Sequence, residues 1–259
     1  ELLPLDQYTA ILVNFSGGKD SLALVLDLLE RGVERDRIQL WHQCVDGEAG
    51  VDQPFVDWPC TESYVRAVGQ ALGVRVLFQW RCGGFLGEML KENAQTQPVR
   101  FERQDGSIGQ AGGLKSKVGT RRRYPQASGD LRVRWCSAVL KIDAFALALN
   151  NDPAFRTGKF LVLTGERREE SANRATFAEK EPHRCDSKRR RVDAWRSVID
   201  WSEDEVWSIL RRWRIQPHPA YRLGFPRVSC FTCIFGGADQ WTSVRKIAPD
   251  RFARIAAYE

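Results

Sequence analysis

The sequence of 259 residues contains no apolar run that approaches the ~20 residues needed to cross a bilayer. Its first residues, Glu1 to Asp6, include acids and lack the basic region that opens a secretory signal peptide. No internal repeat is visible, and neither the Walker A nor the dinucleotide-binding glycine pattern fits residues 14–21. We therefore expect a cytoplasmic protein without a membrane partner, long enough to bury a large core.

The cysteine content does not suit a disulfide framework. The chain has seven cysteines, an odd number, and no expected secretory signal. This favours free thiols, a metal site or sulfur chemistry. We interpret Cys60 and Cys82 as structural. The seven are Cys44, Cys60, Cys82, Cys136, Cys185, Cys230 and Cys233.

Positive charge is in excess, with a formal net charge of +6, and it is clustered. One cluster is the run Lys188–Arg191, and the other lies between residues 115 and 134, where Asp130 is the single acid. Such segments suit phosphate-rich partners, including nucleic acid, although a solvated surface is the alternative. The basic residues of the second cluster are Lys115, Lys117, Arg121, Arg122, Arg123, Arg132 and Arg134.

Strand and helix patterns alternate in the first part of the chain. Apolar runs at 10–15, 37–43 and 74–78 predict strands, and helical periodicity at 20–31 and 61–72 predicts the helices between them. Such alternation implies a parallel sheet with right-handed crossovers. The fold class is therefore α/β, with helices on both faces of the sheet.

Residues 92–134 lack a clear period and are rich in Gly, Gln, Lys and Arg, so we expect a basic lid or flexible loop. We expect an α/β domain over 1–200 and a helical extension over 201–259, which carries a Cys-x-x-Cys pair and packs on the domain. The other expected elements are a helix over 135–150, a buried strand over 160–164, a basic loop over 179–191, a helix over 206–213 and a helical segment over 238–258 interrupted near Pro249.

A glycine-containing turn separates the first strand from the first helix. Its amide groups and the positive end of the helix dipole converge, which makes a cradle for an anion. Glycines permit close approach and positive φ, and a lysine adds a charge suited to phosphate. A turn without a ligand is the alternative interpretation. The residues of the turn are Ser16, Gly17, Gly18, Lys19, Asp20 and Ser21.

A second motif follows the buried strand at 160–164. The carboxyl ends of parallel strands are where open α/β sheets place ligands. Arg167 and Arg174 are suited to neutralise phosphates there, and Glu170 to orient one of the arginines. A helix start with surface ion pairs, each worth little, is the alternative. The motif is Gly165-Glu166-Arg167-Arg168-Glu169-Glu170-Ser171-Ala172-Asn173-Arg174.

These motifs resemble those of a known family. Ser16–Ser21 is similar to the pyrophosphate loop (PP-loop) of the ATP pyrophosphatases, and Gly165–Arg174 resembles the second signature of the phosphoadenosine phosphosulfate (PAPS) reductase family. The resemblance implies a Rossmann-like, adenine nucleotide alpha-hydrolase-like fold that binds ATP and Mg²⁺, with Asp20 as the candidate magnesium ligand. The implied nucleotide-binding residues are Ser16, Gly17, Gly18, Lys19, Asp20, Ser21, Asp46, Gly165, Arg167, Glu170 and Ser171.

The resemblance extends to Arg134–Lys141, to Asp200–Trp207 and to the segment from Pro217 to Cys233. Trp135-Cys136 stands where adenylylsulfate reductases carry a Cys-Cys pair, so one cluster ligand is missing. The variant looks more like the ATP pyrophosphatases of DNA phosphorothioation systems, of the DndC and SspD type. That resemblance implies a DNA substrate, a cysteine desulfurase as sulfur donor, and other subunits of a modification or defence complex.

The role of three cysteines stays open. Cys136, Cys230 and Cys233 are suited to ligate an iron–sulfur cluster or zinc, to relay a persulfide through thiols of lowered pKa, or to be inert. A four-ligand site would need Cys185 or Cys44 as well. The expected catalytic residues are Lys19, Arg167, Arg174, Cys136, Cys230 and Cys233.

Three functions are compatible with the sequence. The first is adenylation of a substrate, DNA more than RNA, for sulfur transfer. The second is thiol-dependent reduction of PAPS or adenylylsulfate. The third is a non-catalytic, nucleotide-gated subunit that binds nucleic acid. His218, between two prolines, is interpreted as a turn or wall residue.

Overall fold

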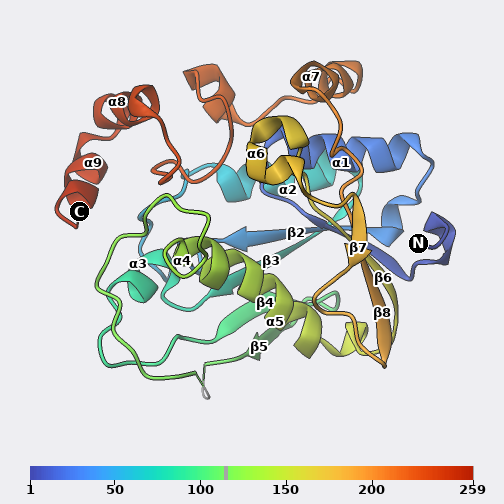
Figure 1. Cartoon of the computed structure of the whole chain (residues 1–259), viewed down its shortest axis with the longest axis horizontal. Helices are drawn as coiled ribbons and strands as arrows, with labels where there is room; N and C mark the ends of the chain where they lie inside the picture. The colour runs from blue at the N-terminus through green and yellow to red at the C-terminus, as the bar shows by residue number, and fades with distance from the viewer. Residues whose placement is uncertain (114–115, 259) are drawn as a thin grey trace. The chain divides into compact units, whose positions relative to one another are not determined.

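The computed structural model describes residues 1–113 and 116–258, so Lys115 of the basic cluster lies outside the described residues. The predicted α/β class is confirmed: a Rossmann-like sheet has helices on both sides (Figure 1). The strand order is β5-β4-β3-β2-β1-β6-β8-β7. The strands are β1 (Ala10–Asn14), β2 (Ile38–Cys44), β3 (Arg75–Arg81), β4 (Val99–Glu102), β5 (Ile108–Ala111), β6 (Gly158–Leu163), β7 (Lys180–Pro182) and β8 (Arg190–Trp195).

The helices agree closely with the sequence patterns in the first part of the chain. The second helix has the predicted bounds and ends at Gly73, whose φ of +65° needs a glycine. None of the helices in the described ranges is long and apolar enough to cross a membrane. The α-helices are α1 (Lys19–Glu30), α2 (Thr61–Leu72), α3 (Gly84–Met89), α4 (Trp135–Ser137), α5 (Asp143–Asn151), α6 (Ala172–Ala175), α7 (Glu203–Arg212), α8 (Ala238–Ile247) and α9 (Pro249–Ala256).

The chain divides into two compact units. Unit 1 contains the parallel part of the sheet, in which β1 pairs with β2 and β6, and β6 pairs with β8. Strand β1 is apolar on both faces, as expected for a strand covered on both sides, and α7 packs against α1. Unit 1 comprises Glu1–His42, Cys60–Leu77 and Asp152–Val228.

Unit 2 contains antiparallel pairs, β3 with β4 and β4 with β5. Helix α5 packs against β4 and β5. A separate core lies among Phe55, Phe85, Trp135 and Leu140, all of them buried. Residues 201–228 fall in unit 1 and 229–259 in unit 2, and the predicted boundary at residue 200 stays a prediction. Unit 2 comprises Gln43–Pro59, Phe78–Asn151 and Ser229–Glu259.

Two expectations of irregular structure are wrong in part. The segment 92–134 contains the hairpin of β4 and β5, and 179–191 contains β7 and the start of β8. Strand β8 was missed because it begins with two arginines, and charged residues are not typical of a buried strand. Arg190 is nevertheless buried, since its guanidinium donates to the carbonyl oxygens of Phe155 at 2.8 Å and Cys185 at 3.1 Å. Buried guanidinium groups need such partners.

The helix predicted over 135–150 is interrupted. A π-helical turn, Ala138–Ile142, separates α4 from α5. Such turns are rare and often occur at functional sites. This one carries Lys141, five residues after Cys136. The spacing of i to i+5 is the one that a π-turn closes.

Candidate functional site

The loop between β1 and α1 has the geometry that its glycines predict. Gly17 has a φ of +81°, which side chains rarely adopt. A Cβ atom at Gly18 would lie 3.3 Å from Ser16 Oγ and 3.4 Å from the carbonyl oxygen of Val228, which is tighter than ordinary contacts. The first-turn amides of α1 have no acceptor within the helix. The loop can therefore bring backbone donors close to an anion.

The structure brings the second motif against this loop within unit 1. A Cβ atom at Gly165 would lie 3.0 Å from the amide nitrogen of Ser21 and 3.1 Å from the carbonyl carbon of Asp20. The end of β6 thus contacts the backbone of the first turn of α1. Position 165 requires glycine because main chain meets main chain here.

Arg167 joins the two motifs. The residue is 3% exposed. Its Nε donates to Asp20 at 2.6 Å, and its Nη1 donates to Glu169 at 2.7 Å and to the carbonyl oxygen of Trp201 at 3.2 Å. Burial alone would lower the pKa of Arg167, but the bond to Asp20 and its charge outweigh burial and raise it. Arg167 is therefore a permanent cation that holds Asp20 in place.

Lys19 is buried beneath the loop, with 4% of its surface exposed. Its amine donates to the carbonyl oxygen of Pro226 at 3.1 Å and lies 3.5 Å from a carboxylate oxygen of Glu203. Its backbone amide donates to the hydroxyl of Tyr221 at 2.8 Å. The hydroxyl oxygen of Tyr221 accepts the hydrogen of an amide that could otherwise donate to a phosphate oxygen.

Glu203 is held ionised by its neighbours. Burial would raise its pKa, but the charge of Lys19 and hydrogen bonds from Trp207 and Lys19 outweigh burial and lower it. It reaches Lys19 because α7 packs on α1 and begins at Glu203. The capping box of Ser202 and Glu205 fixes that helix start.

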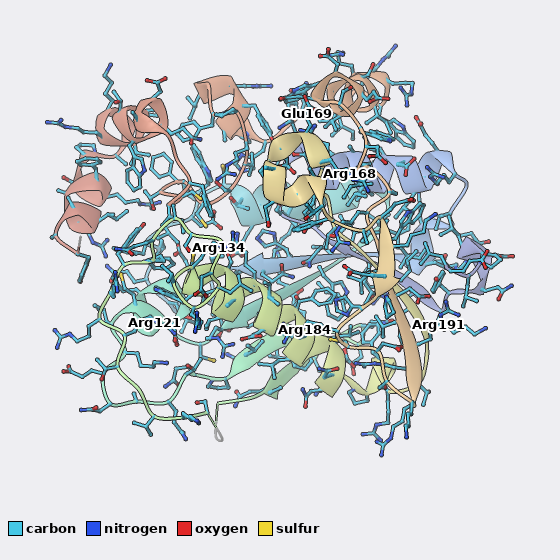
Figure 2. The ribbon with its side chains drawn as sticks, viewed as in Figure 1. Arg121, Arg134, Arg168, Glu169, Arg184 and Arg191 are labelled. Atoms are coloured by element: carbon cyan, nitrogen blue, oxygen red, sulfur yellow. The ribbon has the colours of Figure 1, made fainter. Side chains whose placement is uncertain are left out.

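Glu170 orients an arginine, as predicted. Its carboxylate forms an ion pair with Arg174 and accepts from the backbone amide of Arg167 at 2.9 Å. Ser171 Oγ caps α6 by accepting from the Arg174 amide at 3.3 Å. The Arg174 side chain stays about a third exposed, at 35%, so of Arg167 and Arg174 it is the accessible one. Figure 2 labels Arg168 and Glu169 of the adjoining turn.

Sequence reasoning missed Glu203, Tyr221 and Pro226 as partners of Lys19, and it missed Glu169 as a partner of Arg167. The three partners of Lys19 lie far from residue 19 in the chain, so no local spacing marks them. Tyr221 lies within the segment Pro217–Gly224, which the sequence analysis singled out, but its contact with the Lys19 amide depends on the fold.

Asp46, predicted to contact the nucleotide, belongs to unit 2, whereas the loop belongs to unit 1. Its carboxylate accepts hydrogen bonds from the backbone amides of Phe55, Val56 and Asp57 at 2.9 to 3.0 Å. These bonds fix the turn before α2 and leave its oxygens engaged. Contact with a nucleotide stays a prediction for this residue.

The three cysteines of interest share one cavity of about 40 Å³ in unit 2. A space of that size holds roughly three water molecules. Tyr124 borders it and donates its hydroxyl hydrogen to the carbonyl oxygen of Thr232 at 3.0 Å. The polar and sulfur-bearing lining residues are Cys136, Cys230, Cys233, Lys141, Ser137, Thr232 and Tyr124.

Two thiols of this cavity, those of Cys136 and Cys230, are not activated by their surroundings. Burial raises the pKa of Cys136, and Lys141 only partly offsets the effect. Burial also raises the pKa of Cys230 well above its ordinary value. The charge of a Cys230 thiolate would in turn raise the pKa of Lys141. The relay through thiols of lowered pKa is therefore not supported at Cys136 and Cys230.

A metal centre was one interpretation of these cysteines. Over residues 1–113 and 116–258, no group of three or more His, Cys, Asp or Glu side chains is arranged to hold a metal ion. Asp20, the magnesium candidate, is already neutralised by Arg167 and lies 3.6 Å from the Lys19 amine. Neither set fits a metal as it is arranged here.

Residues 114–235 match the family model described as the phosphoadenosine phosphosulfate reductase domain. Residues 114–235 are therefore similar to a PAPS reductase domain. This stretch includes the second motif and Cys136, Cys230 and Cys233, but not the loop at Ser16–Ser21.

The relatives of this chain are distant. An uncharacterised 37.8 kDa protein of Escherichia phage 186 is 24% identical over 267 residues, covering 97% of this chain and 75% of the phage protein. The adenosine 5'-phosphosulfate reductase of Neisseria meningitidis is 37% identical over 73 residues, 27% of this chain and 28% of the reductase. The adenosine 5'-phosphosulfate reductase of Burkholderia cepacia is 28% identical over 98 residues, which cover 38% of this chain and 35% of the reductase. The matches to the reductases thus span about a third of their length.

Two solved structures are similar at 13% identity. A PAPS reductase from Candida auris in a phosphate complex has a TM-score of 0.47, with 90% of each chain covered. The U34-tRNA thiolase NcsA from Methanococcus maripaludis, with its [4Fe-4S] cluster, has a TM-score of 0.42. The match covers 98% of this chain and 72% of the thiolase chain.

Many of the basic residues of the two clusters are neutralised within the protein. In the cluster Lys188–Arg191, Arg190 is buried and Arg191 donates to Asp193 at 2.7 Å. Arg121 also stacks on the Trp135 ring at 4.7 Å; Figure 2 labels it and Arg134, which directly precedes α4. The ion pairs of the 115–134 cluster are Arg121 with Glu88, Arg122 with Glu92 and Arg132 with Asp130.

Proposed function

We propose that this protein is an ATP pyrophosphatase that adenylates a substrate for sulfur transfer, and that the substrate is DNA that receives a phosphorothioate. The observation that carries the proposal is the close approach of Gly165 to the Ser21 amide, which joins the two motifs at one anion cradle. A phosphate chain needs such a convergence of amides and cations. The sulfur-related names of the relatives support the reaction class.

In this proposal the amides of the loop bind the β- and γ-phosphates of ATP. The hydroxyl of Tyr221 leaves the Lys19 amide when the phosphates bind, because both compete for one donor. Lys19 supplies a charge from below the loop, and Arg174, the more exposed arginine, stabilises charge on the group being transferred. Arg167 positions Asp20 instead of contacting phosphate.

The nucleic-acid part of the proposal depends on the basic side chains that remain accessible. Among the described residues, Lys117, Arg123, Lys188 and Arg189 are exposed and form no salt bridge. Exposed cations of this kind bind phosphate backbones through release of counterions. A cysteine desulfurase as sulfur donor and further subunits of a modification complex complete the proposal as partners.

The test is release of pyrophosphate from ATP in the presence of DNA. Lys19→Ala and Ser16→Ala should abolish it, because one removes the buried charge and the other a hydroxyl at the mouth of the loop. Lys159→Ala, an exposed lysine on β6, is the matched control and should retain the wild-type rate. Wild-type turnover in Lys19→Ala would overturn the assignment of the loop.

A reductase is the second candidate, favoured by the adenosine 5'-phosphosulfate reductases among the relatives. The same cradle would then hold a phosphosulfate and no pyrophosphate would form. Supplying ATP, adenylylsulfate and PAPS in separate reactions distinguishes the two, since only one class of nucleotide should be consumed. Salt-dependent DNA binding with no consumption of any of them would support the non-catalytic subunit instead.

A further inference from the structure

Cys60 lies next to a buried histidine in unit 1. It immediately precedes α2, and its side chain is half-buried. Its Sγ atom is 3.8 Å from Nε2 of His218, and Oγ1 of Thr61 is 3.4 Å from the same nitrogen. His218 itself is fully buried. These contacts form a cysteine–histidine pair that the sequence interpretation of Cys60 as structural did not anticipate.

The hydrogen bonds of His218 fix where its proton lies. Nδ1 accepts the backbone hydrogen of Ala220 at 3.1 Å, so this nitrogen carries no proton. Burial lowers the pKa of His218 to about 4, so the ring is neutral near pH 7. The single ring proton is therefore on Nε2 and points toward Cys60 Sγ and Thr61 Oγ1. His218 acts here as a hydrogen-bond donor.

The start of α2 adds a second stabilising field. Cys60 is the residue before the first turn of a 12-residue helix, where the helix dipole is positive and amide donors lack helical acceptors. Helix N-termini of this kind stabilise thiolates. No amide of the first turn donates to the Cys60 side chain, so the helix start acts on the sulfur atom through its dipole. The dipole and the histidine donor both favour the anionic form of this sulfur.

The pair also lies beside the phosphate loop. Tyr64, one turn along α2, contacts the His218 ring edge to face at a centroid distance of 5.1 Å. A Cβ atom at Gly17 would lie 3.5 Å from the ring of Tyr64. The chain of contacts Gly17–Tyr64–His218–Cys60 stays within unit 1. A sulfur atom on Cys60 would thus be carried close to the nucleotide cradle.

We propose that Cys60 is a sulfur-accepting nucleophile of this protein. Its thiolate attacks the sulfane sulfur of a donor persulfide, forming a new S–S bond on Cys60. The S–S bond of the donor breaks, and the donor leaves as a thiolate with the electron pair. His218 Nε2–H is the positioning donor that holds the Cys60 thiolate. This inference rests on the proposed sulfur-transfer function and names the thiol that first receives sulfur.

The experiment uses the reduced, full-length chain and glutathione persulfide, with no nucleotide. Peptide mass spectrometry follows the addition of one sulfur atom at each cysteine over time. Cys60 should gain sulfur faster than Cys230, whose thiol stays protonated, and faster than Cys185, which is buried. A Cys60 that gains sulfur no faster than these internal references would overturn the proposal.

Variants of His218 test the positioning role. His218→Leu removes the donor and should slow sulfur uptake at Cys60 about tenfold, the effect of losing a charge-assisted hydrogen bond of roughly 1.4 kcal/mol. His218→Gln restores an N–H group and should recover most of the rate. Circular dichroism confirms that each variant is folded. An unchanged rate in folded His218→Leu contradicts the role of the histidine.

The two proposals fail separately. Uptake of sulfur by Cys60 needs no ATP, whereas the proposed function is measured as pyrophosphate release. Fast uptake without pyrophosphate release supports Cys60 as the acceptor and contradicts adenylation. Pyrophosphate release with an inert Cys60 supports adenylation and contradicts the acceptor.

Discussion

At the scale of single residues, Arg167 is better explained by its partners than by the motif in which it occurs. The sequence pattern predicts two phosphate-binding arginines, but in the structure the two differ in burial. Arg167 is buried against Asp20 and Glu169, whereas Arg174 keeps 35% of its side chain exposed. A buried guanidinium that is already paired contributes by holding its carboxylates in position. Spacing alone cannot distinguish these roles, because burial depends on the fold.

Gly165 gives a prediction at this scale. Gly165→Ala places a Cβ atom 3.0 Å from the Ser21 amide nitrogen, and backbone cannot yield as a flexible side chain would. We expect nucleotide binding to be lost and the free energy of unfolding to fall by about 1–3 kcal/mol, the usual cost of overpacking. Titration calorimetry with ATP and chemical denaturation measure the two effects.

The control for this substitution is Gly129→Ala. Gly129 has open space where its Cβ would be placed and no positive φ. It should bind nucleotide as the wild-type chain does. Equal affinity of Gly165→Ala and Gly129→Ala for ATP would show that the contact between β6 and α1 does not shape the loop.

At the scale of elements, the apolar and helical periods of the sequence locate β1, β2, α1 and α2 to within a residue or so, because these elements are long and amphipathic or fully apolar. The short strands β4, β5, β7 and β8 escaped prediction. Strand β8 opens with charge, and β7 is three exposed residues. Their pairing partners stabilise them, and pairing is not visible in local sequence.

The cap of α7 can be tested as an element. Ser202 accepts from the Glu205 amide and thereby fixes the helix start that carries Glu203. Ser202→Ala should lower the free energy of unfolding by about 1 kcal/mol, the ordinary value of an N-cap. Because Glu203 then loses its fixed position, pyrophosphate release should also fall.

Ser208→Ala on the same helix is the matched control, since Ser208 is exposed within the helix and alanine has the higher helix propensity. Its stability should equal or slightly exceed that of the wild type. If Ser202→Ala and Ser208→Ala behave alike in urea denaturation, the capping box does not set the position of α7.

At the scale of the whole molecule, two histidines make stability depend on pH. Burial lowers the pKa of His218 to about 4, and burial together with Arg184 and Arg190 lowers that of His183 to about 4. In the unfolded chain both titrate near 6.5. Between these values the unfolded state binds more protons, so the free energy of unfolding falls as the pH falls from about 6.5 to about 4.

For the fully buried His218, the slope of the free energy of unfolding against pH approaches about 1.4 kcal/mol per pH unit. Urea denaturation at intervals across that range measures it. His218→Gln has no ring to protonate and should flatten the profile by about one proton. A wild-type profile that is level from pH 6.5 to pH 4 contradicts the burial of both neutral rings.

The π-helical turn at Ala138–Ile142 has a consequence for the spacing of the cavity. The turn inserts one residue more than a regular α-helix would have between Trp135 and Asn151. Deleting a residue from this turn would restore a regular helix. Every side chain on one flank would then rotate by about 100° relative to the other. Cys136 and Lys141 would no longer share one lining, although neither had been replaced. The register of the main chain, as much as the choice of amino acid, therefore sets which groups meet the sulfur atoms.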